Sequence, residues 1–483
     1  MTDAPAPETR VQNGVPGAPE GPHDTDVHPV PGAARRFERR ELVALGVIVA
    51  VGVALRLGWC VYAARPPVGL HDPGFYRLYG EQLASGNGYR LPDGSPTAYY
   101  PVGYPLALAA GFLLTPIDWQ TGVVAALNIL WQALAIVAVY AITRRVVAGG
   151  GRSVAPLVAA GAVALWPNLI LHTAVPLSES LFVLLVLVAV LLLVNGPWQG
   201  RRFEATRLVG IGLALGAATL VRPVSVPILL AVFVVWLLAG FGWRRALAHT
   251  AVVTGVLVAT LVPWVIRNAI VMDAAVVSTN TGDNLCMSRR VGGSGSFEFP
   301  NFRCNSGPFD DLPRPAYEVE RDEQGRRLAL EFVREHPVEE VRLVARRAVA
   351  TFASDDDAIA AVESYGDDVF LSDDARDGLE AIANAWYVVV GITGAAGLVV
   401  LAVRRQPEGL AVVLVALALA SAPLAAFGDV RFKVPVLPFL AIGAGVVADA
   451  LVLRRARAAV RSPEAEPPPP VPTVAAAAPP DPA

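Results

Sequence analysis

The chain has 483 residues, of which 54% are hydrophobic and only 17% are charged. Soluble domains carry about 25% charged residues, so this composition excludes an ordinary soluble protein and predicts a polytopic membrane protein. The formal net charge of −3 gives no indication of a nucleic-acid partner. Lys433 is the only lysine, which excludes the P-loop lysine of a Walker nucleotide-binding motif.

Residues 1–34 are rich in Pro, Gly, Ala and Asp without hydrophobic periodicity, which predicts a disordered tail. A group of arginines separates this tail from the first predicted membrane span, 41–62. Because cytoplasmic segments carry the excess of basic residues, the tail is predicted to be cytoplasmic and the loop after the span to face outward. These arginines are Arg35, Arg36, Arg39 and Arg40.

Within the first outer loop, 63–120, the stretch 69–108 is too polar and too rich in Pro and Gly to cross a bilayer, yet it is rich in aromatic residues. Asp72 lies a few positions after the first span. A carboxylate at that depth, beside aromatics and prolines, indicates a site at the membrane surface. Residues 104–116 are apolar but short for a crossing, which needs roughly 20 residues.

Charge decides between two topologies. If 104–116 crossed the membrane, every later arginine cluster would lie outside, whereas a surface position puts these clusters inside. They comprise Arg144, Arg145, Arg152, Arg201, Arg202, Arg207, Arg244, Arg245, Arg404, Arg405, Arg454, Arg455 and Arg457. We therefore predict ten spans and two cytoplasmic termini. The spans are 41–62, 121–142, 154–172, 177–195, 207–221, 224–241, 246–270, 384–403, 408–427 and 434–453.

This topology predicts a domain order. An N-terminal bundle over 35–270 is followed by a large outer loop at 271–383, C-terminal helices at 384–460 and a disordered cytoplasmic Pro/Ala tail at 461–483. Cys286 and Cys304 share the large loop, where a disulfide is chemically allowed and two free thiols are the alternative.

The second part of the large loop has a helical pattern. Residues 317–352 alternate apolar and charged positions as an amphipathic helix on the outer leaflet does, with a kink at Pro337; a small soluble subdomain is the alternative. The acidic run Asp355–Asp357 predicts a solvated loop.

Charged residues converge on the outer side of this topology, and the cations among them oppose the positive-inside rule. A phosphate-bearing ligand would explain them, since guanidinium groups match phosphate oxygens. The candidates for phosphate binding are Arg222, Arg267, Arg431 and Lys433. The candidates for a substrate cleft are Tyr76, Arg77, Tyr99, Tyr100, Tyr104 and Glu179.

Each candidate also has a simpler interpretation. The arginines could reach outer headgroups or flank a span, the tyrosines fit an interfacial belt, and Asp72 before Pro73 could form a plain turn or cap a helix. The cysteines and histidines show no zinc spacing.

Seven motifs, in this order between the predicted spans, resemble the GT-C superfamily of integral membrane glycosyltransferases. The nearest relatives suggested are bacterial members related to protein O-mannosyltransferases and lipid A aminoarabinose transferases. The resemblance covers residues from about 40 to 455. The motifs are HDPGFYRLYGEQLASGNGY, PTAYYPVGYPLALA, PLSES, LVRP, PWVIRN, EFVREHPVEEVRLVARR and GDVRFKVPVLPFL.

The resemblance implies an all-helical membrane bundle with juxtamembrane helices in the first outer loop. It also implies a polyprenyl-phosphate-linked sugar as donor, used at the plasma (inner) membrane. Asp72 matches the first-loop catalytic acid and would act as general base, while the outer cations would stabilise the leaving phosphate.

Two details depart from the family pattern. Some relatives use a divalent metal ion, but their Asp-Glu pair is Asp72–Pro73 here, which leaves a metal open. Tyr99 and Tyr100 stand where aminoarabinose transferases carry charged residues, which argues against that activity.

Three functions therefore compete. The first is an inverting glycosyltransferase whose acceptor hydroxyl belongs to a protein, lipid or glycan. The second is a transporter or lipid flippase, although neither paired repeats nor interrupted helices near the midplane are evident. The third is a non-catalytic membrane scaffold, which would not need Asp72.

Overall fold

The computed structural model describes residues 31–147, 153–196, 198, 204–298, 304 and 306–461. The predicted tails lie outside this range, except that α1 begins at Pro31, within the predicted N-terminal tail. Arg152, Arg201 and Arg202 lie outside it too. The chain divides into two units, 1–43 and 44–483, and the description below concerns the second.

The described residues form helices, with two isolated β-bridges. The elements that carry the bundle are α1 (Pro31–Ala63), α4 (Gln120–Val146), α5 (Ala155–Ala164), α6 (Pro167–Leu171), α7 (Glu179–Val194), α8 (Ala205–Val221), α9 (Ser225–Leu238), α10 (Trp243–Val271), α16 (Asp373–Arg404), α17 (Pro407–Ala425) and α18 (Leu437–Arg461).

The chain is a multi-pass membrane protein by the length and composition of these helices. In the described part of the chain, six helices are long and apolar enough to cross a membrane, or seven if the bent pair Ala155–Ala164 and Pro167–Ala174 is one span. Three more apolar helices, α7, α8 and α9, lie at predicted spans but have only 16, 17 and 14 residues. The all-helical fold is confirmed, whereas the count of ten spans is not.

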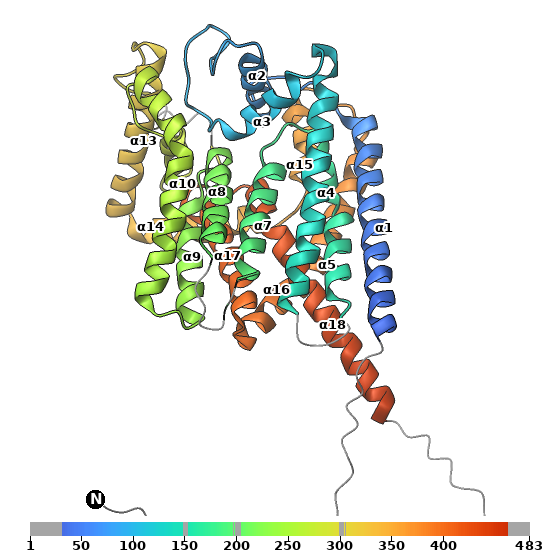
Figure 1. Ribbon diagram of the computed structural model, residues 1–483. Coiled ribbons are helices and arrows are strands. Elements are labelled where there is room, and N and C mark those ends of the chain that lie inside the picture. Colours follow the sequence, from blue (N-terminus) through green and yellow to red (C-terminus); the bar gives the residue numbers. More distant parts are fainter. Residues whose placement is uncertain are drawn as a thin grey trace, which may run out of the picture. The chain divides into compact units, whose positions relative to one another are not determined.

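The first outer loop contains two short helices, α2 (Asp72–Ala84) and α3 (Gly103–Phe112), which pack on each other at one end of the bundle (Figure 1). A ten-residue helix such as α3 is about 15 Å long. It is too short to cross a bilayer alone, in agreement with the predicted surface position. Because α3 also packs on α4 and α8, it fixes the loop to the bundle.

Glycines let the last two long helices approach closely. Gly394 and Gly397 of α16 face Gly443 of α18 so closely that an added Cβ would collide with the backbone opposite. Small residues at such crossings allow tight packing where lipid supplies no hydrophobic driving force between helices. This crossing fixes α18, the helix that follows the 3₁₀ segment Val430–Val436.

The large outer loop is also helical. It contains α11 (Thr281–Cys286), α13 (Arg314–Glu335), α14 (Pro337–Phe352), α15 (Asp357–Val362) and the short 3₁₀ turn η3 (Ser364–Gly366). Pro337 breaks the predicted amphipathic stretch into α13 and α14, because a proline favours the first turn of a helix.

Two further features of this loop bear on the predictions. Val338, Val341 and Val349 of α14 are exposed, as an interfacial helix requires, but its position on the leaflet stays a prediction. Cys286 and Cys304 form a disulfide.

Candidate active site

Asp72 is the first residue of α2, with His71 before it and Pro73 in the first turn. An acidic residue in the first turn is stabilised by the helix dipole, and Pro is favoured there because its missing N–H would have no partner. The local sequence His-Asp-Pro therefore fixes the carboxylate at the end of the helix. Its side chain is 27% exposed, so it lies at the surface of the site and not in the core.

Two groups bind the Asp72 carboxylate directly. The Tyr100 hydroxyl donates to Oδ1 at 2.5 Å, and Arg431 Nη2 donates to Oδ2 at 2.5 Å. Burial by itself would raise the pKa of Asp72, but the charge of Arg431 and these two hydrogen bonds lower it below its ordinary value. Asp72 is therefore ionised at neutral pH.

The contacts of Arg431 extend the site to a second carboxylate. Its Nε lies 3.0 Å from Glu179 Oε1, and Arg222 Nη1 donates to the same oxygen. Arg222 also donates to Ser178 Oγ at 3.2 Å. Asp72, Glu179, Arg222 and Arg431 thus form a four-charge cluster in which two guanidinium groups balance two carboxylates.

Four different elements bring this cluster together. Asp72 opens α2, Glu179 opens α7, Arg222 ends α8, and Arg431 lies in the 3₁₀ helix η4 (Val430–Val436) before α18. An acid at a helix start and a base at a helix end are both favoured by the helix dipole. The guanidinium carbons of Arg222 and Arg431 lie 5.3 and 5.9 Å from the centre of the Phe432 ring, which supports both cations.

Three of the predicted tyrosines, Tyr76, Tyr100 and Tyr104, pack together beside Asp72. The Tyr76 ring contacts the rings of Tyr100 and Tyr104, with centroids 5.0 and 5.2 Å apart. Burial and the nearby Asp72 charge raise the pKa of Tyr100, so its hydroxyl stays protonated and can donate to the carboxylate. Tyr99 points elsewhere and donates to Asp283 Oδ2 at 2.8 Å.

The structure does not bring the other predicted cations into the cluster. Arg267 donates to the backbone oxygens of Thr97 and Tyr89 at 2.7 and 2.8 Å, so it clamps the first outer loop onto α10. Arg77 pairs with Glu81 and binds Thr121. The phosphate-binding role predicted for Arg267 and the cleft role predicted for Arg77 stay predictions.

Lys433 lies in a second, buried network. Its Nζ is 3.0 Å from Asp355 Oδ1, and both side chains are at most 1% exposed. Asp355 also accepts from Trp166 Nε1 at 2.7 Å and from Asn168 Nδ2 at 3.0 Å. The phosphate-binding role of Lys433 stays a prediction, and the contacts show that it anchors η4, the element that carries Arg431.

The solvated loop predicted over Asp355–Asp357 is wrong. Asp355 is fully buried, because Lys433 and Trp166 replace its water contacts. Asp357 pairs with His172 at 3.1 Å. Burial would raise the pKa of Asp357, but the nearby charge of His172 lowers it to about 2.

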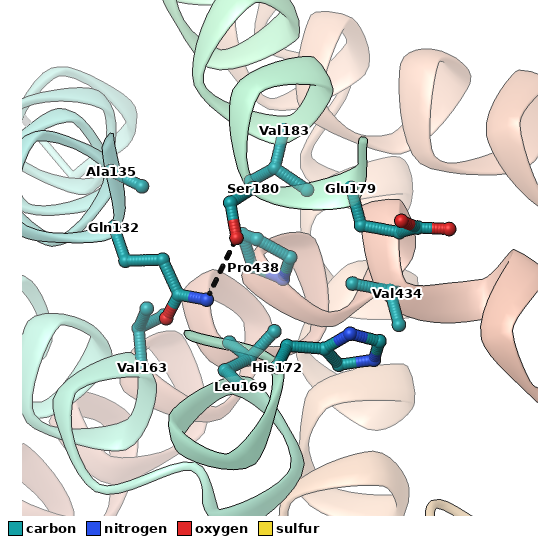
Figure 2. Close-up of a pocket in the computed structure, with 10 residues that line it drawn as sticks. All are labelled: Gln132, Ala135, Val163, Leu169, His172, Glu179, Ser180, Val183, Val434 and Pro438. Carbon is teal, nitrogen blue, oxygen red and sulfur yellow. Dashed lines mark hydrogen bonds between the residues drawn. The ribbon is translucent and has the colours of Figure 1, made fainter. Parts of the chain in front are cut away.

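A small cavity separates this network from the cluster. Figure 2 shows Glu179 and His172 on its lining, with Gln132 donating to Ser180 across it at 3.1 Å. The cavity measures ≈ 10 Å³, about the space that one water molecule needs. The core behind the cluster therefore has room for about one water molecule.

Sequence reasoning missed Tyr365. Arg431 Nη1 donates to its hydroxyl at 3.3 Å and Nη2 donates to Asp72, while the Arg431 Nε lies at ion-pair distance from Glu179. The only signal was a single tyrosine before a glycine in an acidic stretch of the outer loop.

The residues of the site do not fit a divalent metal ion. Both cluster carboxylates are already balanced by arginines. Across the described ranges, no group of three or more His, Cys, Asp or Glu side chains is placed to hold a metal. The site as built relies on guanidinium groups for positive charge.

Comparison with known proteins gives structural similarity only. No protein-family model matches the sequence, and no curated protein matches it either. The chain is similar to the oligosaccharyltransferase of Archaeoglobus fulgidus tethered with an acceptor peptide, with 16% identity, a TM-score of 0.50, and 86% of this chain and 50% of that chain covered.

Two further structures are similar to the chain. AglB of the same organism, in complex with an inhibitory peptide and a dolichol-phosphate, has 15% identity and a TM-score of 0.49, with 88% of this chain and 52% of that chain covered. ArnT from Cupriavidus metallidurans bound to undecaprenyl phosphate has 16% identity and a TM-score of 0.38, with 82% and 77% covered.

The chain spans about half the length of the oligosaccharyltransferases it matches. The match at a TM-score of 0.50 confirms the predicted resemblance at the level of the fold: the chain has the fold of the GT-C membrane glycosyltransferases.

Proposed function

We propose that the chain is an inverting membrane glycosyltransferase. It moves a sugar from a polyprenyl-phosphate donor to an acceptor hydroxyl on the extracytoplasmic face of the plasma (inner) membrane, with both termini in the cytoplasm. The acceptor is a protein, lipid or glycan hydroxyl. The observation that carries the proposal is the Asp72–Arg431 ion pair, a partly exposed carboxylate beside two arginines at one end of a membrane bundle.

The four-charge cluster suits this chemistry. Arg222 and Arg431 are held by Glu179, and their side chains are only 17% and 14% exposed. Planar guanidinium groups bind phosphate oxygens through paired N–H donors, and their charge counts for more where little water screens it. These two arginines are therefore our proposed ligands of the donor phosphate.

Asp72 acts as the general base in this mechanism. It takes the proton of the acceptor hydroxyl as the hydroxyl oxygen attacks the anomeric carbon. The bond between that carbon and the phosphate oxygen breaks, its electron pair leaves with the polyprenyl phosphate, and the configuration inverts. Arg222 and Arg431 stabilise the charge that develops on the leaving phosphate.

The similar structures and the membrane setting support a lipid-linked donor. One similar structure holds dolichol-phosphate and another holds undecaprenyl phosphate. Nucleotide sugars are absent outside the cytoplasmic membrane, so a donor carried by a membrane lipid is the physically reasonable source of sugar for an outward-facing site.

The variant Asp72→Asn tests the proposal. Membranes that contain the full chain are supplied with radiolabelled polyprenyl-phosphate sugar, and transfer of label out of the lipid is followed. Loss of a general base lowers the rate by about 100-fold or more. Asp93→Asn is the matched control, because Asp93 is an exposed residue of the same loop whose carboxylate accepts from the backbone nitrogen of Ser95.

Unimpaired transfer by Asp72→Asn would remove the catalytic assignment. If the wild type transfers no sugar and Asp72→Asn loses solute uptake, the result would instead favour a transporter. Glycan analysis of a deletion strain would then name the donor sugar and the acceptor together.

A further inference from the structure

The turn that holds Tyr365 is strained. Ser364, Tyr365 and Gly366 have successive φ angles of 50°, 57° and 104°. Residues with a Cβ rarely adopt positive φ, and bulky ones such as tyrosine are unfavourable there. Strain of this kind persists only where the surroundings enforce it, and it gathers at functional sites.

Glu363 enforces the turn. Its Oε1 accepts from the backbone nitrogens of Phe370 and Leu371 at 3.0 and 2.8 Å, and its Oε2 accepts from Arg376 Nη2 at 2.9 Å. Ser364 Oγ accepts from Val68 N at 3.0 Å, which fixes the turn to the segment before α2. These hydrogen bonds therefore hold the turn in place and fix the position of its central residue, Tyr365.

The side chain that it presents is an aromatic ring at the mouth of the site. Tyr365 is 41% exposed. Its hydroxyl lies 3.3 Å from Arg431 Nη1, and its ring lies 5.0 Å from the His71 ring, next to Asp72. His71 in turn pairs with Asp367 of the same turn at 3.1 Å.

Arg431 does not need Tyr365 for its charge balance, because Asp72 and Glu179 already supply it. The strain must therefore serve the ring itself. An exposed aromatic face beside charged groups is the surface on which a sugar packs its C–H face, while the sugar hydroxyls reach the polar neighbours.

We propose that Tyr365 is the binding platform for the saccharide ring of the lipid-linked donor. Its ring packs on the sugar, while Arg431, which Asp72 and Glu179 already hold, binds the donor phosphate. The proposal rests on the proposed function, since it names the part of the donor that this side of the site recognises. It predicts that Tyr365 distinguishes sugar-loaded lipid from sugar-free lipid.

The test compares two ligands on the purified full chain. Affinity is measured for undecaprenyl phosphate and for undecaprenyl phosphate carrying mannose, glucose, galactose or arabinose. The wild type binds at least one sugar-loaded lipid more tightly than the sugar-free lipid. In Tyr365→Asn that preference falls by roughly tenfold, the size of an aromatic contact, while affinity for the sugar-free lipid changes little.

Asparagine is chosen because it tolerates positive φ. The thermal midpoint of Tyr365→Asn should equal or exceed that of the wild type, so a loss of preference cannot be ascribed to misfolding. Tyr365→Phe keeps the ring and should retain most of the preference. Tyr62→Ala is the control, because Tyr62 is an exposed ring that contacts Phe370 and not the cluster.

The outcomes separate the two proposals. If the wild type binds neither kind of lipid, the proposed function fails. If it binds sugar-free and sugar-loaded lipids equally, or if Tyr365→Asn keeps the full preference, the platform is overturned while the proposed function stands.

Discussion

Among the residues of the four-charge cluster, we expect loss of the Glu179 charge to destabilise the fold most. Its side chain is 1% exposed and lies between Arg222 and Arg431. Glu179→Gln keeps the shape of the side chain but removes its charge. Within the cluster, the two guanidinium groups then share the single carboxylate of Asp72.

The size of the effect follows from the geometry. Arg431 Nε lies 3.0 Å from Glu179 Oε1, a separation worth about 5 kcal/mol at an effective dielectric constant of about 20. Removing the charge also removes its desolvation cost, and breaking a buried pair costs about 3–5 kcal/mol in practice. Because both arginines touch water, we expect about 3 kcal/mol, which lowers the thermal midpoint of a chain of this length by roughly 3 °C.

The assay is thermal unfolding of the purified chain, followed by tryptophan fluorescence. Glu204→Gln is the control, since Glu204 is 69% exposed and lies 3.7 Å from Arg207; exposed pairs contribute little. A double-mutant cycle with Arg222→Met isolates the coupling between Glu179 and Arg222. Equal midpoints for Glu179→Gln and Glu204→Gln would refute the reasoning.

Further predictions concern pH, the disulfide and the loop clamp. The pKa of Asp72 is lowered from 3.8, so its stabilising contribution is complete above that pH and is lost as the pH falls through the lower folded-state value. The gap in thermal midpoint between wild type and Asp72→Asn should stay constant from pH 8 to about 5; a gap that closes above pH 5 contradicts this. Cys286 and Cys304 are separated by 18 positions, so replacing both with serine should destabilise the outer loop by about 3 kcal/mol and speed its limited proteolysis; unchanged cleavage would argue against it. Arg267→Met should raise proteolysis of the first outer loop without removing donor binding, which is the reverse of what a phosphate ligand would do.

Local sequence was sufficient to predict much of the fold. Apolar runs located the spans, and the arginine pattern favoured a surface position for 104–116, where α3 is indeed too short to cross. The simpler interpretation of Asp72 before Pro73 as a helix cap came close, since Asp72 is the first residue of α2. The span count was less secure, because α7, α8 and α9 are apolar but only 14 to 17 residues long.

The site was predicted in part, since Asp72, Glu179, Arg222 and Arg431 do meet. Local sequence could not say which cations would meet them. Arg267 and Arg431 both stand beside a predicted span, and only tertiary structure directs one to carbonyls of the first loop and the other to Asp72.

Two residues show that contacts distant in sequence cannot be read from local sequence: Asp355 was placed wrongly, and Tyr365 was not predicted at all. Asp355 looked solvated because its acidic neighbours are polar, yet its buried partner Lys433 is 78 positions away in sequence. Tyr365 carried no pattern, since its place at the site depends on a strained turn that Glu363 enforces.

Charge balance links the proposed roles of the cluster. Two arginines and two carboxylates sum to zero, so a donor phosphodiester with one negative charge leaves the occupied site at minus one. Bringing that anion to Arg431 weakens the hold of Arg431 on Asp72 and raises the proton affinity of the carboxylate, because the ion pair is what lowers its pKa. When the donor bond breaks, the phosphate gains a second negative charge as Asp72 gains a proton, so the site's charge does not change during the reaction. The Asp72–Arg431 pair in the free enzyme is therefore consistent with a role of Asp72 as base. The donor phosphate that binds Arg431 is the anion that frees Asp72 to accept a proton.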